Sequence, residues 1–150
     1  MKFSEMTYTR PDAESTKQHL AALTEQLKAA KSYEEARKVF LAQQEQAKHI
    51  STASTLASVR HSIDTRDEFY DAEEKFWNGF YPELQEYAQQ WTQAMLESSF
   101  RADFEKEFGD LMFVNAEIAL KTFSPAIIPE LQQENDLTQE YEKLLASAQI

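Results

Sequence analysis

The stretch that decides the fold is Arg60-His61-Ser62-Ile63-Asp64-Thr65-Arg66-Asp67-Glu68-Phe69-Tyr70-Asp71-Ala72-Glu73. It contains the end of one predicted helix, at about Ile63, and the start of the next, near Thr65. Thr65 and Glu68 have the spacing of a capping box, in which the hydroxyl accepts from an amide one turn later and the carboxylate reaches back. Because a short connection places two helices antiparallel, the stretch predicts a helical hairpin.

Two helices are predicted before the end of this stretch. The first runs from about Asp12, its N-cap, to Lys31, and one face of it carries Leu20, Leu23 and Leu27. The second begins at Ser32, which forms a capping box with Glu35, and continues to about residue 63. Its residues 51–58 have mostly small side chains, which favours close helix packing over a Ser-rich linker. Residues 7–11 are predicted to be an extended lead-in, because Pro11 disfavours helix at the residue before it.

The third helix carries large side chains at helical spacing: Phe69, Phe76, Phe80, Leu84, Tyr87, Trp91 and Met95. Such a stripe is typical of a core-facing helix, and the alternative is a peptide-binding groove lined by the aromatic residues between positions 69 and 113. Pro82 interrupts the stripe, because it has no amide for the carbonyl of Asn78 and its ring clashes with that carbonyl. We therefore predict a kink or short break around residues 78–82, helped by Gly79.

Three shorter helices are predicted after the third. Ser98 or Ser99 caps a helix that ends at Gly109 with positive φ, and one side of it carries Phe100, Phe104 and Phe108. Asp110 starts the next helix, which carries Leu111, Val114, Ile118 and Phe123. The last helix begins irregularly at Ser124, Pro125 and Pro129 and runs to about Ala148. Residues 1–150 are thus predicted to form one all-α domain, an antiparallel bundle of about five or six helices that includes long hairpin helices.

The charge of the chain limits its partners. Its 150 residues carry a formal net charge of -11 and no cysteine. So acidic a surface repels phosphate backbones and anionic lipids, which disfavours nucleic acid and membranes as partners. No stretch is long and apolar enough to span a bilayer, so a cytoplasmic protein is expected. The absence of cysteine excludes disulfides, thiolate catalysis and Cys-ligated metal.

The three histidines do not have the spacing of a metal site. Neither His19, His49 nor His61 begins a His-Glu-x-x-His motif, which places two zinc-binding imidazoles and a general base on one helix. None follows a glutamate at the three-residue spacing of di-iron bundles. Glu45 precedes His49 by four residues, a spacing more typical of a surface hydrogen bond. We expect no catalytic residue and no metal ligand within the chain.

A dense acidic run follows His61 and comprises Asp64, Asp67, Glu68, Asp71, Glu73 and Glu74. Paired carboxylates of this kind can serve acid–base chemistry or a hard cation. The alternative is a solvated helix face whose negative charges favour the helix N-terminus, and we prefer it for Glu68, Asp71 and Glu74. A buried polar contact near His61 is left open for Asp64 and Glu73.

Short motifs follow one another along nearly the whole chain. They are Tyr8-Thr9-Arg10-Pro11, Ser51 to His61, Asp64-Thr65-x-Asp67-Glu68-Phe69-Tyr70-x-x-Glu73, Ser98-Ser99-Phe100-Arg101, Phe108-Gly109, Leu120 to Pro125, and Glu134-Asn135-x-Leu137 through Tyr141 to Leu144-Leu145-Ala146-Ser147-Ala148. In this order the chain resembles the N-terminal helical region of oligoendopeptidase F-like zinc metallopeptidases, in the thimet oligopeptidase-like superfamily.

The resemblance implies a larger, mostly helical peptidase with a deep channel for oligopeptide substrates. In that family two histidines of a His-Glu-x-x-His helix and a later glutamate hold zinc, and the motif glutamate activates the zinc-bound water. This motif is absent through Ile150. The resemblance therefore implies zinc in the full-length enzyme and none in this chain, which alone is expected to be inactive. The expected role of this chain is to form part of the wall that restricts the channel to short peptides. The resemblance assigns no substrate-binding residue.

Two other interpretations stay open. The chain can be a free-standing helical protein-binding module without enzymatic activity, although residues 144–150 lack the charged tail of a natural end and favour a longer protein. A carboxylate-bridged metalloprotein is disfavoured by the histidine spacing. As part of a larger enzyme, the chain is expected to expose an apolar face and to self-associate through it.

Overall fold

The computed structural model describes residues 3–122 and 124–148, and all regular structure within these ranges is helical. Six α-helices follow one another: α1 (Ala13–Ala29), α2 (Tyr33–Ile63), α3 (Glu68–Leu96), α4 (Arg101–Phe108), α5 (Leu111–Thr122) and α6 (Ile128–Ser147). Two short 3-10 helices, η1 (Phe3–Glu5) and η2 (Pro125–Ile127), precede α1 and α6. The prediction of an all-α bundle with long hairpin helices is confirmed.

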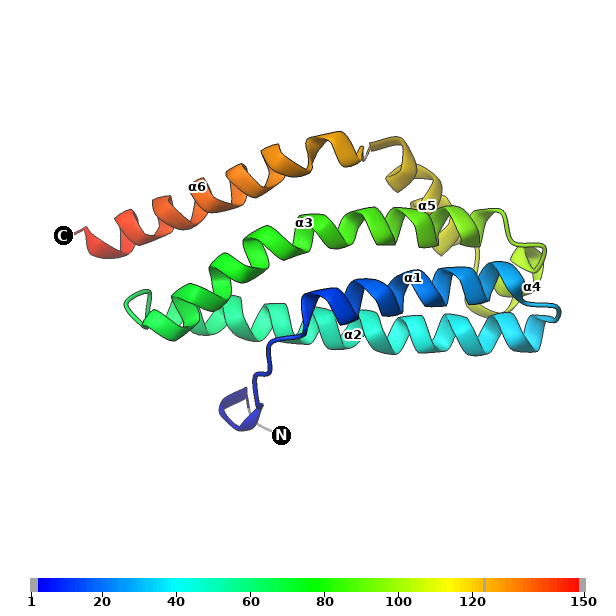
Figure 1. Ribbon diagram of the computed structural model, residues 1–150, viewed down its shortest axis with the longest axis horizontal. Coiled ribbons are helices and arrows are strands. Elements are labelled where there is room, and N and C mark those ends of the chain that lie inside the picture. The colour runs from blue at the N-terminus through cyan, green and yellow to red at the C-terminus, as the bar shows by residue number, and fades with distance from the viewer. Residues whose placement is uncertain (1–2, 123, 149–150) are drawn as a thin grey trace.

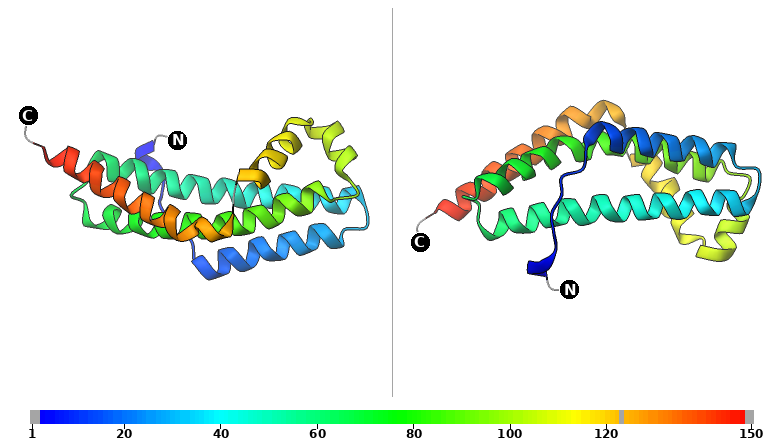
Figure 2. Two further views of the ribbon diagram at one scale, coloured as in Figure 1. Left: turned by 90° about the horizontal axis from the view of Figure 1, so that it is seen from above. Right: turned by 60° about the horizontal axis from the view of Figure 1, so that its bottom comes forward.

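The long helices form an elongated antiparallel bundle (Figure 1). α1 and α2 are joined as a hairpin, and α3 packs against both of them. α6 lies along α3 and runs in the opposite direction, while α4 and α5 lie near the turn between α1 and α2. The N-terminal segment crosses α2 before α1 begins, as the right view of Figure 2 shows. α3 is therefore the central helix, in contact with α1, α2, α5 and α6.

The helix starts confirm two predicted caps and correct a third. Asp12 Oδ1 accepts from the amide of Ser15, and Ser32 Oγ accepts from the amide of Glu35. α3 begins at Glu68 and not near Thr65, because the side chain of Asp67 caps it and accepts from the amides of residues 69 and 70. The Asp67 carboxylate thereby satisfies two of the free backbone donors at the start of α3.

The boundaries of the shorter helices differ in detail from the prediction. No side chain caps α4, and Ser98 Oγ accepts from the amide of Phe100 before the helix starts. Gly109 ends α4 at φ 87°, as predicted for a residue that needs positive φ. At the next boundary, residues 125–127 form η2 and α6 begins only at Ile128, with Pro129 in its first turn. Phe123, predicted to lie on α5, falls outside the described residues.

Pro82 bends α3 without breaking it. The helix is continuous from Glu68 to Leu96, and Figure 1 shows its axis changing direction near the middle. Pro82 has no amide to donate to the carbonyl of Asn78. This carbonyl accepts from Asn135 Nδ2 at 3.2 Å instead. The carbonyl of Gly79 accepts from Gln132 Nε2 at 2.7 Å. The predicted kink is thus present without a break, and α6 supplies hydrogen-bond donors to the carbonyls at the bend.

The core consists of two clusters of buried apolar side chains. The first lies toward the turn between α1 and α2 and includes Leu23, Leu27, Ala36, Phe40, Trp91, Ala94, Met95, Phe104 and Phe113. The second contains Ala57, Trp77, Phe80 and Leu84, with Leu20, Ile50 and Phe76 packed against it. The aromatic stripe of α3 is therefore mainly core, except that its first member, Phe69, is 55% exposed.

Large apolar side chains of α5 and α6 face solvent. On α5 the exposed apolar residues are Leu111, Val114 and Ile118. Along α6 the exposed apolar residues are Leu137, Tyr141, Leu144 and Leu145. Large apolar side chains that are exposed along a helix are typical of a contact face. The expectation of an uncovered apolar face agrees with these exposures.

Candidate functional site

The histidines and acidic residues of the described ranges do not form a metal centre. His19 and His49 are exposed on α1 and α2, whereas His61 is fully buried near the end of α2. Glu45, considered above as a partner of His49, faces Lys48 at 3.8 Å. Within residues 3–122 and 124–148, no group of three His, Asp or Glu side chains could hold a metal ion. The same ranges contain no helix both long and apolar enough to cross a membrane.

Glu73 makes the buried polar contact that the sequence left open, but with partners other than His61. The residue is 3% exposed, and its carboxylate accepts from Arg10 Nη2 at 2.6 Å, from Arg10 Nε at 2.8 Å and from the hydroxyl of Tyr8. Trp77 Nε1 donates to the same hydroxyl at 3.1 Å. Asp64 is exposed and caps the turn by accepting from the amide of Arg66. The contact of Glu73 thus fastens the N-terminal segment to α3.

The electrostatics of this contact follow from burial and charge. The hydrogen bonds from Arg10, against the opposing effect of burial, hold the pKa of Glu73 below its ordinary value of 4.5. Burial, together with the hydrogen bond to Glu73, raises the pKa of Tyr8 to about 12. Both shifts keep the carboxylate charged and the phenol neutral at pH 7, so the arrangement holds no proton ready for transfer.

Asp71 and Glu74 are not on a solvated face, contrary to the preferred interpretation of the acidic run. Asp71 accepts from Gln139 Nε2 at 3.1 Å, and Lys143 of the same helix, α6, also contacts its carboxylate. Burial acts to raise the pKa of Asp71, but the bonds from Lys143 and Lys75 outweigh it and lower the pKa. Burial raises the pKa of Glu74. The prediction failed for these two residues because α6, some 70 residues later in the chain, packs over this part of α3.

His61 lies beside these two carboxylates. Its Nε2 is 3.4 Å from Asp71 Oδ1, outside hydrogen-bond geometry, and neither ring nitrogen has a hydrogen-bond partner among the described residues. The imidazole is buried between α2 and α3 and is not accessible to a substrate at the surface.

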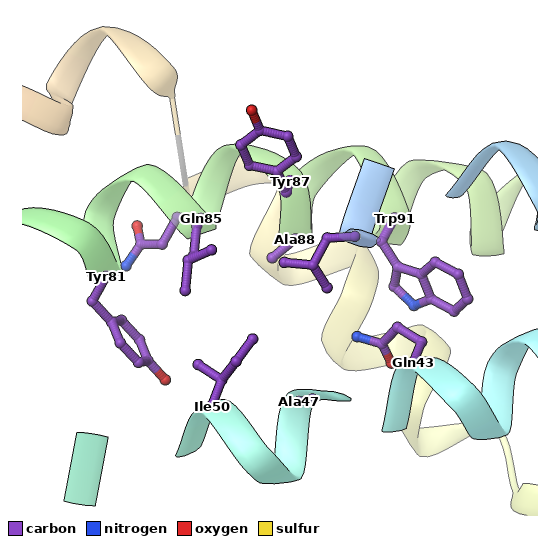
Figure 3. A pocket seen from close by; sticks show the side chains of 10 residues that line it. Gln43, Ala47, Ile50, Tyr81, Gln85, Tyr87, Ala88 and Trp91 are labelled. Carbon is purple, nitrogen blue, oxygen red and sulfur yellow. The ribbon is translucent and has the colours of Figure 1, made fainter. Parts of the chain in front are cut away.

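A mostly apolar pocket lies between α1, α2 and α3 (Figure 3). It has a volume of about 140 Å³. Tyr81 and Trp91 stand at its two ends, Ala47 and Ile50 lie on the α2 side, and the ring of Tyr87 points away from Ile50. The remaining lining residues are Leu20, Gln43, Leu84, Gln85 and Ala88. A mostly apolar hollow with a few polar groups is the usual form of a small binding site.

The pocket exists because the two core clusters do not meet. Trp91 belongs to the first cluster, whereas Leu84 belongs to the second. Between them, Ala47 and Ala88 line the pocket with side chains too small to fill it. Larger side chains at these two positions would pack into the hollow and fill it, so the small residues keep it open.

Sequence analysis identified only part of this pocket. The stripe predicted for α3 contains Leu84, Tyr87 and Trp91, and these three residues line the pocket. Tyr81 and Gln85 were missed. In the sequence, Gln85 directly follows the core residue Leu84. That position does not show which other helix Gln85 faces.

The comparisons with known proteins agree with this fold. The sequence model of the family described as Peptidase M3 N-terminal domain matches residues 3–123. No curated protein matches the sequence. A crystal structure of a provisionally assigned oligoendopeptidase F from Bacillus anthracis strain Ames is 37% identical, with a TM-score of 0.95 over 100% of this chain and 28% of that chain.

Two further structures are equally similar. Another provisionally assigned oligoendopeptidase F, from crystals grown by microfluidic seeding, is 37% identical with a TM-score of 0.95, covering 100% of this chain and 26% of that chain. PZ peptidase A with an inhibitor is 37% identical with a TM-score of 0.95, covering 99% of this chain and 26% of that chain. The chain thus spans about a quarter of the length of these structures. The chain belongs to the family of Peptidase M3 N-terminal domains.

Proposed function

We propose that the chain is the non-catalytic N-terminal part of a zinc-dependent oligoendopeptidase that hydrolyses short peptides. The observation that carries this proposal is the likeness of the whole chain, at 37% identity and a TM-score of 0.95, to about a quarter of two provisionally assigned oligoendopeptidases F. Identity at this level over the whole chain supports a common role for this part of the longer proteins. The activity itself belongs to the longer protein.

Zinc and the catalytic residues are proposed to lie outside these 150 residues. The sequence lacks His-Glu-x-x-His, and the described residues bring together no set of three metal-ligating side chains. The residues present therefore do not fit zinc, which requires three protein ligands and an open position at a catalytic site. We derive no chemical step from this chain.

The role proposed for this part is to form a wall of the substrate channel and to restrict the channel to short peptides. Two features support it. The long helices with their two buried clusters make a stiff unit, and the exposed apolar residues of α5 and α6 offer a face against which the remainder can pack. We further propose a cytoplasmic location and oligopeptides as partners. The net charge of -11 disfavours nucleic acid and anionic membranes as partners.

The proposal is tested first on the gene and then on the protein. Sequencing downstream of residue 150 should show an open reading frame that encodes His-Glu-x-x-His and a later glutamate. A frame that stops at residue 150 would refute the proposal and leave a free-standing binding module. The longer protein and residues 1–150 alone should then be assayed with internally quenched peptides of increasing length, with and without added zinc. We expect cleavage of short peptides by the longer protein only.

The wall itself is tested by substrate size. The longer protein should cleave short unfolded peptides and leave a folded protein of similar sequence intact. Removal of residues 1–150 should relax this limit if the remainder stays folded, as checked by circular dichroism. Equal size selectivity in the two proteins would contradict the wall and leave the peptidase assignment standing.

A further inference from the structure

We infer that the pocket between α1, α2 and α3 binds the phenyl ring of a phenylalanine side chain in an oligopeptide. The inference rests on the proposed function for its choice of a peptide as the source of the ring. The pocket itself is independent of that choice, since its walls are all residues of this chain.

The size of the pocket points to a single ring. Its volume is about 140 Å³. Apolar cavities of roughly 150 Å³ in other proteins hold one benzene molecule and otherwise stay dry. A bicyclic indole needs more room, and a methyl group leaves most of the space empty, so the volume selects a side chain of intermediate size.

The chemistry of the walls points to an aromatic side chain. Leu20, Ile50, Leu84 and the methyl groups of two alanines supply an apolar lining. Trp91 closes one end of the pocket, so that a bound ring can contact the indole edge to face or stacked with an offset. No ionisable side chain other than the two tyrosines lines the pocket. A charged side chain would therefore lose its hydration there without gaining a partner.

The mouth of the pocket has groups that suit a peptide backbone. Gln43 and Gln85 carry amides, each with donors and an acceptor, and Tyr81 adds a hydroxyl from a side chain that is 43% exposed. A peptide that inserts its ring places its own amide and carbonyl groups near this rim.

The test uses Trp91 as the reporter. The chain has two tryptophans, and replacing Trp77, which does not line this pocket, by Phe leaves the fluorescence of Trp91 alone. This variant is titrated with acetylated tripeptide amides of the form Ala-X-Ala, where X is Phe, Leu or Ala. We expect the Phe peptide to shift the fluorescence at saturation and to bind about tenfold or more tightly than the Ala peptide. Equal binding of the Phe and Ala peptides, or tighter binding of the Leu peptide, would overturn the inference.

Variants that fill the pocket supply the control. Ala47→Leu should weaken binding of the Phe peptide at least about tenfold, because its isobutyl group occupies the site of the ring. Ala42→Leu places the same side chain on an exposed position of α2 and should change nothing. If Ala47→Leu fails to fold by circular dichroism, Ala88→Leu fills the pocket from α3 at an exposed position. Undiminished binding in a folded filling variant would refute the inference.

The same titration in the longer protein separates this inference from the proposed function. A Phe-dependent response there, abolished by Ala47→Leu, supports the pocket as a peptide site. If residues 1–150 respond but the longer protein does not, the rest of the longer protein covers the pocket. That outcome overturns the inference. Because the titration measures binding and not cleavage, a reading frame without a peptidase motif would remove the proposed function while leaving the ring-binding result intact.

Discussion

Replacing Glu73 by Gln removes the charge from the contact that holds the N-terminal segment on α3. The carboxylate accepts two hydrogen bonds from Arg10 and one from Tyr8, and the residue is 3% exposed. Hydrogen bonds to a charged group contribute about 1.5–3 kcal/mol, against about 0.5–1.5 kcal/mol for neutral pairs. The side chain of Arg10 is 46% exposed, so solvent screens its share of the ion pair.

With that screening, we expect Glu73→Gln to lower the free energy of unfolding by about 2 kcal/mol at pH 7. For a chain of this size, such a change lowers Tm by about 4–8 °C. The measurement is urea and thermal unfolding followed by circular dichroism at 222 nm. Glu86→Gln is the matched control, because it removes the same charge from an exposed position of the same helix. Indistinguishable stabilities of the two variants would refute the argument.

The pH dependence gives an independent check. The hydrogen bonds from Arg10 lower the pKa of Glu73 from 4.5 in the folded chain, although burial opposes them. The stabilisation is therefore fully present above pH 4.5 and is lost as the pH falls through the lower folded-state pKa. The difference in Tm between the natural chain and Glu73→Gln should shrink over that acidic window. A difference that stays constant down to pH 3 would show that the charge of Glu73 contributes nothing.

Three further predictions concern other parts of the bundle. Phe104→Ala, at a fully buried position, should cost about 3–5 kcal/mol of unfolding free energy in urea, and a loss below about 1 kcal/mol would contradict its place in the core. Asn135→Ala removes a donor to the bend of α3 and should cost about 1–3 kcal/mol with faster hydrogen exchange in α6, whereas exposed Asp136→Ala should leave both unchanged. Burial and the hydrogen bond to Glu73 raise the pKa of Tyr8 to about 12, so Tyr8→Phe should reduce the absorbance change at 295 nm near that pH; an unchanged titration there would contradict the raised pKa.

The long helices could be predicted from the sequence because their signals are local. Asp12 and Ser32 cap α1 and α2 as expected, and Gly109 has the positive φ that ends α4. Each of these signals involves residues within one helical turn, where propensity and capping act without help from the rest of the chain. Asp67 displaced the expected cap at Thr65 because both residue types can cap, and only the geometry of the turn selects one of them.

The candidate site was less predictable because it depends on which helices meet. The pocket combines Leu20 of α1, Ala47 of α2 and Ala88 of α3, and no pattern within one helix shows that two alanines line the same gap. The partners of Glu73 lie 63 and 65 residues away along the chain. The resemblance, by contrast, was recognisable because the order of several motifs is itself a property of the sequence.

The sequence by itself determined that the chain is an all-helical domain, that its surface is strongly acidic and that it lacks a zinc-binding motif. These properties depend on composition and on periodicities shorter than two turns. Only the tertiary structure decided that α6 packs along the bend of α3, where Asn135 supplies the donor that Pro82 lacks. It also decided that Asp71 lies under α6 rather than in solvent. The physical reason is that burial and hydrogen bonding are properties of pairs of surfaces, and the second surface lies tens of residues away in the sequence.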